Sequence, residues 1–245
     1  MTQLSILIPV YGQQAFTKQC LIDLQSLPEG FEIIIWDNAS TDSTEAMMKD
    51  IIANWTGCHL RYIKNATNIG FGRAMNQLYR LASGDNILFL NNDIRIKEKG
   101  DWWSVPLKLS EEGNLVGTQT GLLDKNFNFV REGKDDLADP LTYLSGWWLM
   151  ASKKTLDTMR VKKKWSEKDK CIKEAIIADG PFPEELFAYF EDCWLSWLAR
   201  RKGINLIRID VPFFHFGRQT GKKMNISDMY RESRVKFQAY WKGKV

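Results

Sequence analysis

The first half of the chain alternates short apolar runs with longer amphipathic stretches. Some of the apolar runs have the length and composition of buried β-strands, and they cover residues 4–10, 31–36, 59–63 and 87–90. The stretches between them predict helices over about 15–27, 45–52 and 68–81. Pro28 to Gly30 ends the first helix, and Asp42 with Glu45 resembles a capping box that opens the second. The pattern is therefore strand, helix, strand.

Strands that alternate with helices in this way indicate a mostly parallel β-sheet with helices on both faces. In such sheets, ligands bind outside the carboxyl ends of the strands. Polar residues directly follow the predicted strands, as Tyr11-Gly12-Gln13, Asp37-Asn38 and Asn91-Asn92-Asp93. We therefore expect all three segments to line one edge of the sheet.

The second half has a less regular pattern. Residues 100–140 are rich in Gly, Asp and Lys and predict loops and short strands, and the charged segment 160–182 is expected to be exposed or mobile. Helical periodicity over 187–201 ends at Gly203, a strand is predicted over 204–211, and 227–241 has the pattern of a basic amphipathic helix. The sequence contains no internal repeat and no clear linker, so we predict one composite domain.

Composition narrows the class of protein. The chain has 245 residues, 44% of them hydrophobic, and a net charge of +4. It can therefore bury a substantial core, and its charge suits an anionic ligand without requiring nucleic acid. Its four cysteines form no CxxC pair, which favours reduced thiols. Because the sequence has no signal-peptide pattern and no bilayer-length apolar run, we predict a cytoplasmic protein with at most peripheral membrane contact.

The polar segments at the predicted sheet edge each have two interpretations. Asp93 follows a strand and offers the oxygen ligands that Mg²⁺ and Mn²⁺ prefer, but Asn and Asp are also common in turns. Asp37 and Asn38 could accept hydrogen bonds from a base or a ribose, or they could cap the next helix. The local pattern leaves both questions open.

Two other segments could carry chemistry. The glycine-rich segment 68–73 precedes a helix, where backbone N–H groups and the Arg73 charge favour phosphate, although the spacing is not that of the dinucleotide fingerprint. Glu191 and Asp192 are adjacent carboxylates in an apolar stretch. Burial would raise their pKa values and suit a general base, or they could pair with nearby arginines on an exposed helix face.

Aromatic neighbours raise similar alternatives. His215 lies among phenylalanines, where a histidine is either a hydrogen-bonded core residue or, if it meets Asp93, a metal ligand. Trp147 and Trp148 could form a pocket wall that stacks on a sugar or base, or they could anchor the core. His59 has no such context, and we interpret it as structural.

Together these segments resemble the inverting glycosyltransferases with the GT-A fold, a family that includes bacterial rhamnosyl- and galactosyltransferases. The matching segments are, in order, Ile8-Pro9-Val10-Tyr11, 37–42, 68–76, 90–93, Gly146, Phe190-Glu191-Asp192 and His215. Each segment is short, but their common order over residues 4–217 argues against coincidence. The resemblance implies an α/β GT-A fold with a mostly parallel central sheet flanked by helices.

The resemblance also implies roles for individual residues. A nucleoside-diphosphate sugar donor would be bound by Pro9, Tyr11, Asp37, Asn38, Asn68, Gly70, Arg73, Asn76 and Asn92. Asp93 and His215 would hold Mn²⁺ or Mg²⁺, and Asp192, paired with Glu191, would deprotonate the acceptor hydroxyl. No motif of the family places Trp147 and Trp148, and their role as an acceptor or pocket wall rests on their aromatic side chains alone. The family commonly has an acid where this chain has Asn91, so the metal would rest on fewer protein ligands.

The predicted organisation is a glycosyltransferase domain over 1–217, divided into a nucleotide-sugar-binding half, 1–98, and an acceptor half, 99–217. A basic helical segment, 218–245, would pack on this domain. The expected acceptor is a saccharide or a lipid-linked glycan.

Two alternatives remain open. The basic segments 162–164 and 222–244, with Trp165, Tyr240 and Trp241, motivate an enzyme that glycosylates a modified base in DNA, which would require base flipping. A protein of another class would bind a nucleotide or a sugar without catalysis. The presence of both Asp93 and Asp192 argues against that class, because binding alone needs no base.

Overall fold

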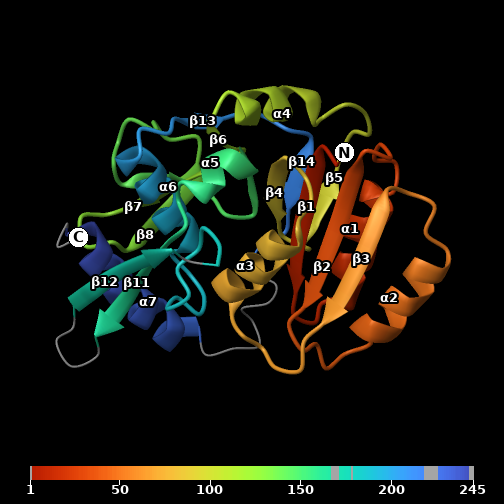
Figure 1. The fold of residues 1–245 in the computed structure, drawn as a ribbon, viewed down its shortest axis with the longest axis horizontal. Helices are drawn as coiled ribbons and strands as arrows, with labels where there is room; N and C mark the ends of the chain where they lie inside the picture. Colours follow the sequence, from red (N-terminus) through yellow and green to blue (C-terminus); the bar gives the residue numbers. More distant parts are fainter. Residues whose placement is uncertain (1, 167–170, 178, 218–225, 243–245) are drawn as a thin grey trace.

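The centre of the molecule is a seven-stranded sheet (Figure 1). The computed structural model describes residues 2–166, 171–177, 179–217 and 226–242. The strand order is β13-β6-β10-β4-β1-β2-β3. Neighbouring strands pair in parallel except β10, which is antiparallel to both β4 and β6. The strands are β1 Leu4–Val10, β2 Phe31–Asp37, β3 His59–Lys64, β4 Asn86–Leu90, β6 Leu115–Gly117, β10 Trp148–Ser152 and β13 Leu206–Arg208.

The predicted mostly parallel sheet and its first four strands are confirmed, because these strands are buried on both faces. Within β1, Ile6 packs into a hydrophobic cluster on one face of the sheet and Leu7 into the cluster on the other. Every residue of β4 is buried. A strand covered on both sides reads as a continuous apolar run, which is the signal the sequence carries.

Helices cover both faces of the sheet, as predicted. Residues of α1 (Gln14–Leu24), α2 (Thr44–Ala53) and α4 (Ser104–Glu111) pack into one cluster. Residues of α3 (Phe71–Leu81), α5 (Lys153–Asp157) and α6 (Glu191–Arg201) pack into the other. None of the helices in the described ranges is long and apolar enough to cross a bilayer.

Several small sheets make up the second half of the chain. Strands β7 (Thr120–Leu123), β8 (Phe129–Gly133) and β9 (Thr142–Leu144) form a sheet with the order β8-β7-β9. Strand β14 (Phe213–His215) pairs with β5 (Ile94–Ile96), and β11 (Val161–Ser166) pairs with β12 (Cys171–Ile177). The expectation of an exposed or mobile 160–182 segment is wrong at Phe182, which is buried. The strand predicted over 204–211 is limited to Leu206–Arg208.

The last helix, α7 (Ile226–Trp241), lies beside β12 (Figure 1) and reaches α6 through aromatic side chains. The Tyr240 ring meets the Trp194 ring at 4.5 Å between centroids, and Phe237 stacks on Phe190 at 5.4 Å. Tyr240 is completely buried and Trp241 packs against the same cluster. The Tyr240 ring is therefore not available as a stacking surface for a DNA base. The side chains of 162–165 and residues 218–225 lie outside the described part of the chain.

Candidate active site

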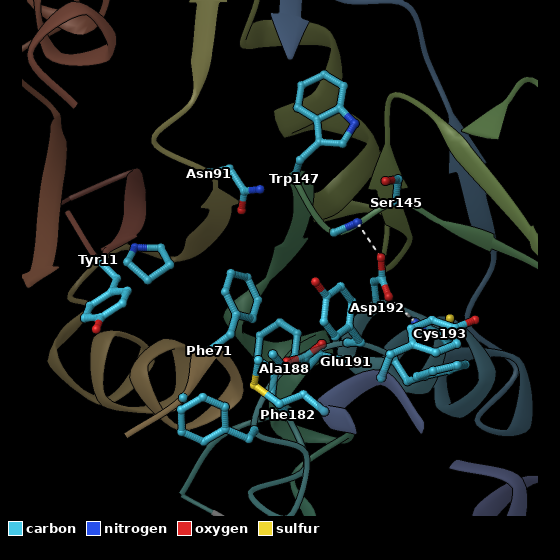
Figure 2. Close-up of a pocket in the computed structure, with 18 of the residues that line it drawn as sticks. Tyr11, Phe71, Asn91, Ser145, Trp147, Phe182, Ala188, Glu191, Asp192 and Cys193 are labelled. Atoms are coloured by element: carbon cyan, nitrogen blue, oxygen red, sulfur yellow. Dashed lines mark hydrogen bonds between the residues drawn. The ribbon is translucent and has the colours of Figure 1, made fainter. Parts of the chain in front are cut away.

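A cavity of about 560 Å³ opens at the carboxyl edge of the sheet (Figure 2). Its wall combines the ends of β1, β2 and β4 with the turn before β10, the start of α6 and residues from β8 and α7. Many of the predicted site residues line it: Pro9, Tyr11, Asn38, Asn68, Gly70, Asn92, Asp93, Trp147, Glu191, Asp192 and His215. Residues that are far apart in the sequence thus meet in one cavity.

Four predicted site residues lie outside the cavity wall. Trp148 is completely buried in the core between the sheet and its helices, where it meets Trp102 and Phe213, so it does not form a pocket wall. Arg73 is exposed and donates to the Glu184 carbonyl rather than facing the cavity. Asp37 and Asn76 are buried behind the wall.

Asn38 joins the end of β2 to the glycine-rich loop. Its Nδ2 donates to Asn68 Oδ1 at 2.7 Å, and its Oδ1 accepts from the Ile69 N–H at 2.9 Å. Asp37 supports this corner from behind, because its carboxylate accepts from the Ser40 N–H and from the Tyr62 hydroxyl. This side of the cavity is therefore fixed by hydrogen bonds within the protein.

The start of α3 is held against the segment that precedes α6. Gly70 has a φ of +87°, and a Cβ built there would lie 2.6 Å from the Phe187 carbonyl oxygen. That carbonyl accepts from the Phe71 N–H at 2.8 Å. Asn76 uses its side-chain amide to bind both the N–H and the carbonyl of Phe182, a residue of the cavity wall. Gly70 and Asn76 thus shape the cavity through other residues.

Asp93 and His215 meet at the end of β4. Their Oδ1 and Nε2 atoms lie 3.1 Å apart, because β14 pairs with β5 and sets His215 opposite Ile94. The Trp147 ring stacks on the His215 ring, with 4.9 Å between centroids and 13° between planes. The Asn91 side-chain amide lies 3.4 Å from His215 Nε2. Trp147 thereby orients the imidazole toward the carboxylate.

This pair fits a divalent cation. A carboxylate oxygen and an imidazole nitrogen form a donor set that Mn²⁺ accepts, and such a site leaves room for phosphate oxygens. Both side chains line the cavity. In the described ranges no group of three His, Cys, Asp or Glu side chains gathers around one point. A metal here would therefore draw its remaining ligands from the donor and from water.

Asp192 is held at the other side of the cavity by backbone N–H groups. Its Oδ2 accepts from the Gly146 N–H at 2.9 Å, and its Oδ1 accepts from its neighbour Cys193 at 2.8 Å (Figure 2). A Cβ at Gly146 would come within 3.0 Å of the Asp192 Cβ, so the glycine permits this approach. Burial raises the pKa of Asp192 to about 6, although these hydrogen bonds oppose the rise.

Glu191 is more deeply buried than Asp192 and opens α6. Its Oε1 has no hydrogen-bond partner, and burial raises the pKa of its carboxyl to about 8. The preceding residues, Tyr189 and Phe190, both have φ above +70°, which is strained for aromatic side chains. This strained turn explains why the helix predicted from 187 begins at Glu191.

The arginines near this pair have other partners. The Arg200 guanidinium donates to the carbonyls of Leu137 and Thr142, and that of Arg201 lies over the Trp197 ring. The alternative in which Glu191 and Asp192 pair with arginines on an exposed helix face is therefore not what the structure contains.

Sequence reasoning missed several residues of the cavity wall, among them Glu132, Tyr143 and Ser145. Ser145 donates to Glu132 Oε1 at 3.0 Å and directly precedes Gly146, which holds Asp192. No motif singles them out, because β8 and β9 are short and their pairing through β7 brings Glu132 and Tyr143 together.

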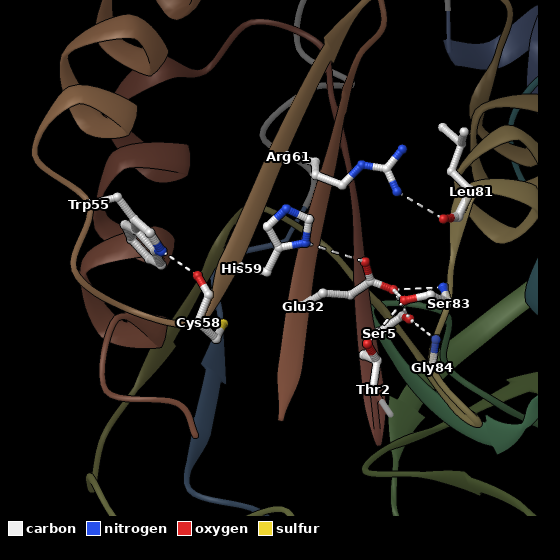
Figure 3. A network of polar contacts seen from close by, with 10 residues as sticks. All are labelled: Thr2, Ser5, Glu32, Trp55, Cys58, His59, Arg61, Leu81, Ser83 and Gly84. Atoms are coloured by element: carbon white, nitrogen blue, oxygen red, sulfur yellow. Dashed lines mark hydrogen bonds and ion pairs between the residues drawn. The ribbon is translucent and has the colours of Figure 1, made fainter. Parts of the chain in front are cut away.

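Another buried carboxylate lies at the opposite, amino edge of the sheet (Figure 3). Glu32 accepts from the Ser5 hydroxyl at 2.5 Å and from the Ser83 N–H at 2.7 Å, and these bonds help to lower its pKa. His59 Nδ1 lies 3.9 Å from its other oxygen. The network joins β1, β2 and the turn before β4, which fits the structural role predicted for His59.

Comparison with known proteins gives a consistent result. A model of glycosyl transferase family 2 matches residues 5–168. The uncharacterized glycosyltransferase YfnE of Bacillus subtilis (strain 168) is 30% identical over 188 residues, which are 75% of this chain and 42% of that protein. The chain thus spans less than half the length of this relative.

Two solved structures show the same fold. The mannosyltransferase PcManGT from Pyrobaculum calidifontis, in complex with GDP-Man and Mn²⁺, has a TM-score of 0.59 at 15% identity, covering 85% of this chain and 55% of that one. TarS 1-349 of S. aureus, in complex with UDP-GlcNAc, has a TM-score of 0.61 at 15% identity, covering 99% of this chain and 68% of that one. The predicted GT-A fold is confirmed.

Proposed function

Because the chain belongs to glycosyl transferase family 2, we propose that it transfers a sugar from a nucleoside-diphosphate sugar to an acceptor hydroxyl, with inversion at the anomeric carbon. The observation that carries this proposal is the single cavity lined on one side by Asp93 and His215 and on the other by Asp192. The first pair suits the diphosphate end of a donor. The second side suits an acceptor hydroxyl, and we propose a saccharide or a lipid-linked glycan as its bearer.

Asp192 is the general base in this proposal. Its carboxylate takes the proton of the acceptor hydroxyl while that oxygen forms a bond to the anomeric carbon. The bond from the anomeric carbon to the diphosphate oxygen breaks, and the nucleoside diphosphate leaves with its electron pair. The N–H groups of Gly146 and Cys193 hold the carboxylate in position. With a pKa of about 6, Asp192 is mostly ionised at pH 7 and still basic enough to assist.

Asp93 and His215 would hold Mn²⁺ or Mg²⁺. Such an ion offsets the negative charge that develops on the leaving diphosphate. The donor complexes named above, one with Mn²⁺ and one with UDP-GlcNAc, support a nucleotide-sugar donor for this chain as well. The lining polar residues Asn38, Asn68 and Asn92 offer hydrogen bonds to the nucleotide, and Pro9 and Tyr11 form the wall beside them.

The proposal is tested by donor binding and by turnover. Thermal shifts with nucleoside diphosphates and nucleotide sugars, each with and without Mn²⁺, identify the donor, since a ligand that binds the folded state raises its apparent stability. Release of the nucleoside diphosphate then measures turnover, and its rate should rise with pH through about 6 as Asp192 ionises. The proposal is contradicted if the protein binds no nucleotide sugar. It is also contradicted if the turnover rate does not change with pH around 6.

A further inference from the structure

Glu132 is a carboxylate at the acceptor side that the proposed reaction leaves without a role. It lies on the edge strand β8, is exposed, and lines the cavity. Its Oε1 accepts from the Ser145 hydroxyl at 3.0 Å. Within the described residues, no Lys or Arg forms an ion pair with it. Glu132 is therefore a charged group within reach of a ligand in the cavity.

The three-stranded sheet places Glu132 and Tyr143 in one row. In the register of this sheet Gly121 is opposite Glu132 on one side and opposite Tyr143 on the other. Directly opposed residues share a face of a sheet. Because a Cβ built at Gly121 would overlap the Tyr143 ring, the glycine lets that ring lie across the sheet toward Glu132. Both side chains line the cavity.

This row is coupled to the proposed base through two adjacent residues. Ser145 donates to Glu132, and its neighbour Gly146 donates its N–H to Asp192. A sugar acceptor whose hydroxyl reaches Asp192 would therefore extend toward Glu132. Neighbouring ring hydroxyls are donors, and a carboxylate has acceptor sites for more than one of them.

The carboxylates on this side of the cavity favour an uncharged acceptor over a negatively charged one. Glu132, Glu191 and Asp192 all line it, and the described lining contains no Lys or Arg. Because burial raises the pKa of Glu191 to about 8, that group is mostly neutral at pH 7, and the negative charge on this side comes from Glu132 and Asp192. A negative charge on the acceptor at this place would be repelled and unpaired.

We propose that Glu132 is a specificity-determining residue, which binds adjacent hydroxyl groups of an uncharged sugar acceptor and excludes an acceptor that carries a negative charge there. This inference rests on the proposed glycosyl transfer. It assigns a substrate class to the acceptor side, namely neutral polyhydroxylated sugars.

Matched glycosides test the inference. The probes are p-nitrophenyl β-glucoside and β-galactoside, each compared with the corresponding hexuronide, which differs only by a carboxylate. Their dissociation constants are measured by ligand-observed NMR, on the free protein and again with UDP and Mn²⁺. Wild type should bind at least one neutral glycoside about tenfold more tightly than its hexuronide, the effect of one charged hydrogen-bonding group.

The variants are Glu132→Gln, Glu132→Lys and, as a control, Glu29→Gln at an exposed glutamate outside the cavity. Glu132→Gln should weaken the neutral glycoside about tenfold, Glu132→Lys should reverse the preference toward the hexuronide, and Glu29→Gln should change neither. Circular dichroism and a separate thermal shift with UDP and Mn²⁺ report whether fold and donor site are intact.

Three results would overturn the inference: equal binding of a glycoside and its hexuronide by wild type, unchanged affinities in Glu132→Gln, or no binding of any probe up to about 50 mM, beyond which affinity is negligible. Failure of the proposed function has a different signature. A protein that binds no nucleoside diphosphate or nucleotide sugar contradicts glycosyl transfer, whereas glycoside binding to the free protein still tests the role of Glu132.

Discussion

The proposed donor side and the proposed acceptor side of the cavity differ in the hydrogen bonding of their buried polar groups. On the donor side, the side chains of Asp37 and Asn38 are buried, and each makes hydrogen bonds within the protein at 2.6 to 3.2 Å. On the acceptor side, Glu191 Oε1 is buried without a partner, and burial raises the pKa values of both Glu191 and Asp192. The buried polar groups of the proposed donor side thus have hydrogen-bond partners. The proposed acceptor side holds carboxylates whose burial disfavours the charged form.

This difference suits two separate tasks, recognition of the donor and transfer of a proton. A rigid, satisfied corner suits recognition, because its geometry does not depend on the ligand. Carboxylates with raised pKa values suit proton transfer, and such groups are concentrated at functional sites. Loss of a hydrogen-bonded side chain such as Asn38 should therefore reduce stability, whereas loss of the Asp192 carboxylate should reduce turnover.

The largest effect is expected from Asp192→Asn. The amide keeps the shape of the side chain but cannot take a proton, so turnover should fall about 10³-fold. Donor binding, measured by thermal shift, should persist. Asp50→Asn at an exposed helical position is the matched control. Turnover of Asp192→Asn at the wild-type rate would remove this residue from the mechanism.

A smaller loss is expected from His215→Ala at the proposed metal pair. We expect turnover to fall about 10²-fold, the typical cost of losing one group that stabilises developing charge. The Mn²⁺-dependent part of the thermal shift should shrink at the same time. The other histidine, His59, has an exposed side chain at the opposite edge of the sheet, so His59→Ala should keep that shift. Equal behaviour of the two variants would contradict a metal site at His215.

On the donor side, Asn38→Ala should reduce stability. It leaves the Ile69 N–H and the Asn68 side chain without their buried partner. The free energy of unfolding should decrease by about 2 kcal/mol, as measured by chemical denaturation. The affinity for the donor should decrease too, while the pH dependence of turnover is kept. A change in that pH dependence would show that the two sides are not independent.

The smallest effect concerns Glu191 and pH. Its pKa is raised from 4.5 to about 8, so between these pH values the folded state binds more protons than the unfolded state. The free energy of unfolding contributed by this group therefore falls as pH rises through that window. Glu191→Gln should remove this loss and be more stable than wild type at pH 9 by about 1 kcal/mol or more. Parallel stability curves for the two proteins would contradict the raised pKa.

The regular half of the fold could be predicted because its strands are buried on both faces. Residues 4–10 form β1 with the predicted bounds, and β4 is a continuous buried run. The second half could not be predicted in the same way. Strands such as β9 and β14 have only three residues, too few to show a period. The sequence does not predict the positive φ angles of Tyr189 and Phe190, because residues with aromatic side chains seldom adopt positive φ.

The sequence identifies many of the residues that line the cavity, but it does not show which of them lie next to one another. The local pattern left Asp93 between a turn and a ligand, and only the pairing of β14 with β5 brings His215 to it. The two adjacent tryptophans illustrate the limit, because Trp147, in the turn before β10, lines the cavity, whereas Trp148, the first residue of β10, is completely buried in the core. Glu132 was missed because its position depends on strand pairing, which the sequence does not encode locally.

The single antiparallel strand of the central sheet affects how the chain must be made. Strand β4 pairs with β1 on one side and with β10 on the other. A growing chain that has reached residue 98 therefore has β4 with one edge of unpaired backbone N–H and C=O groups, and such an edge is a template for association with other chains. It stays open until residues 148–152 emerge from the ribosome. Residues 86–90 and 148–152 must therefore both be made before this edge of β4 is covered.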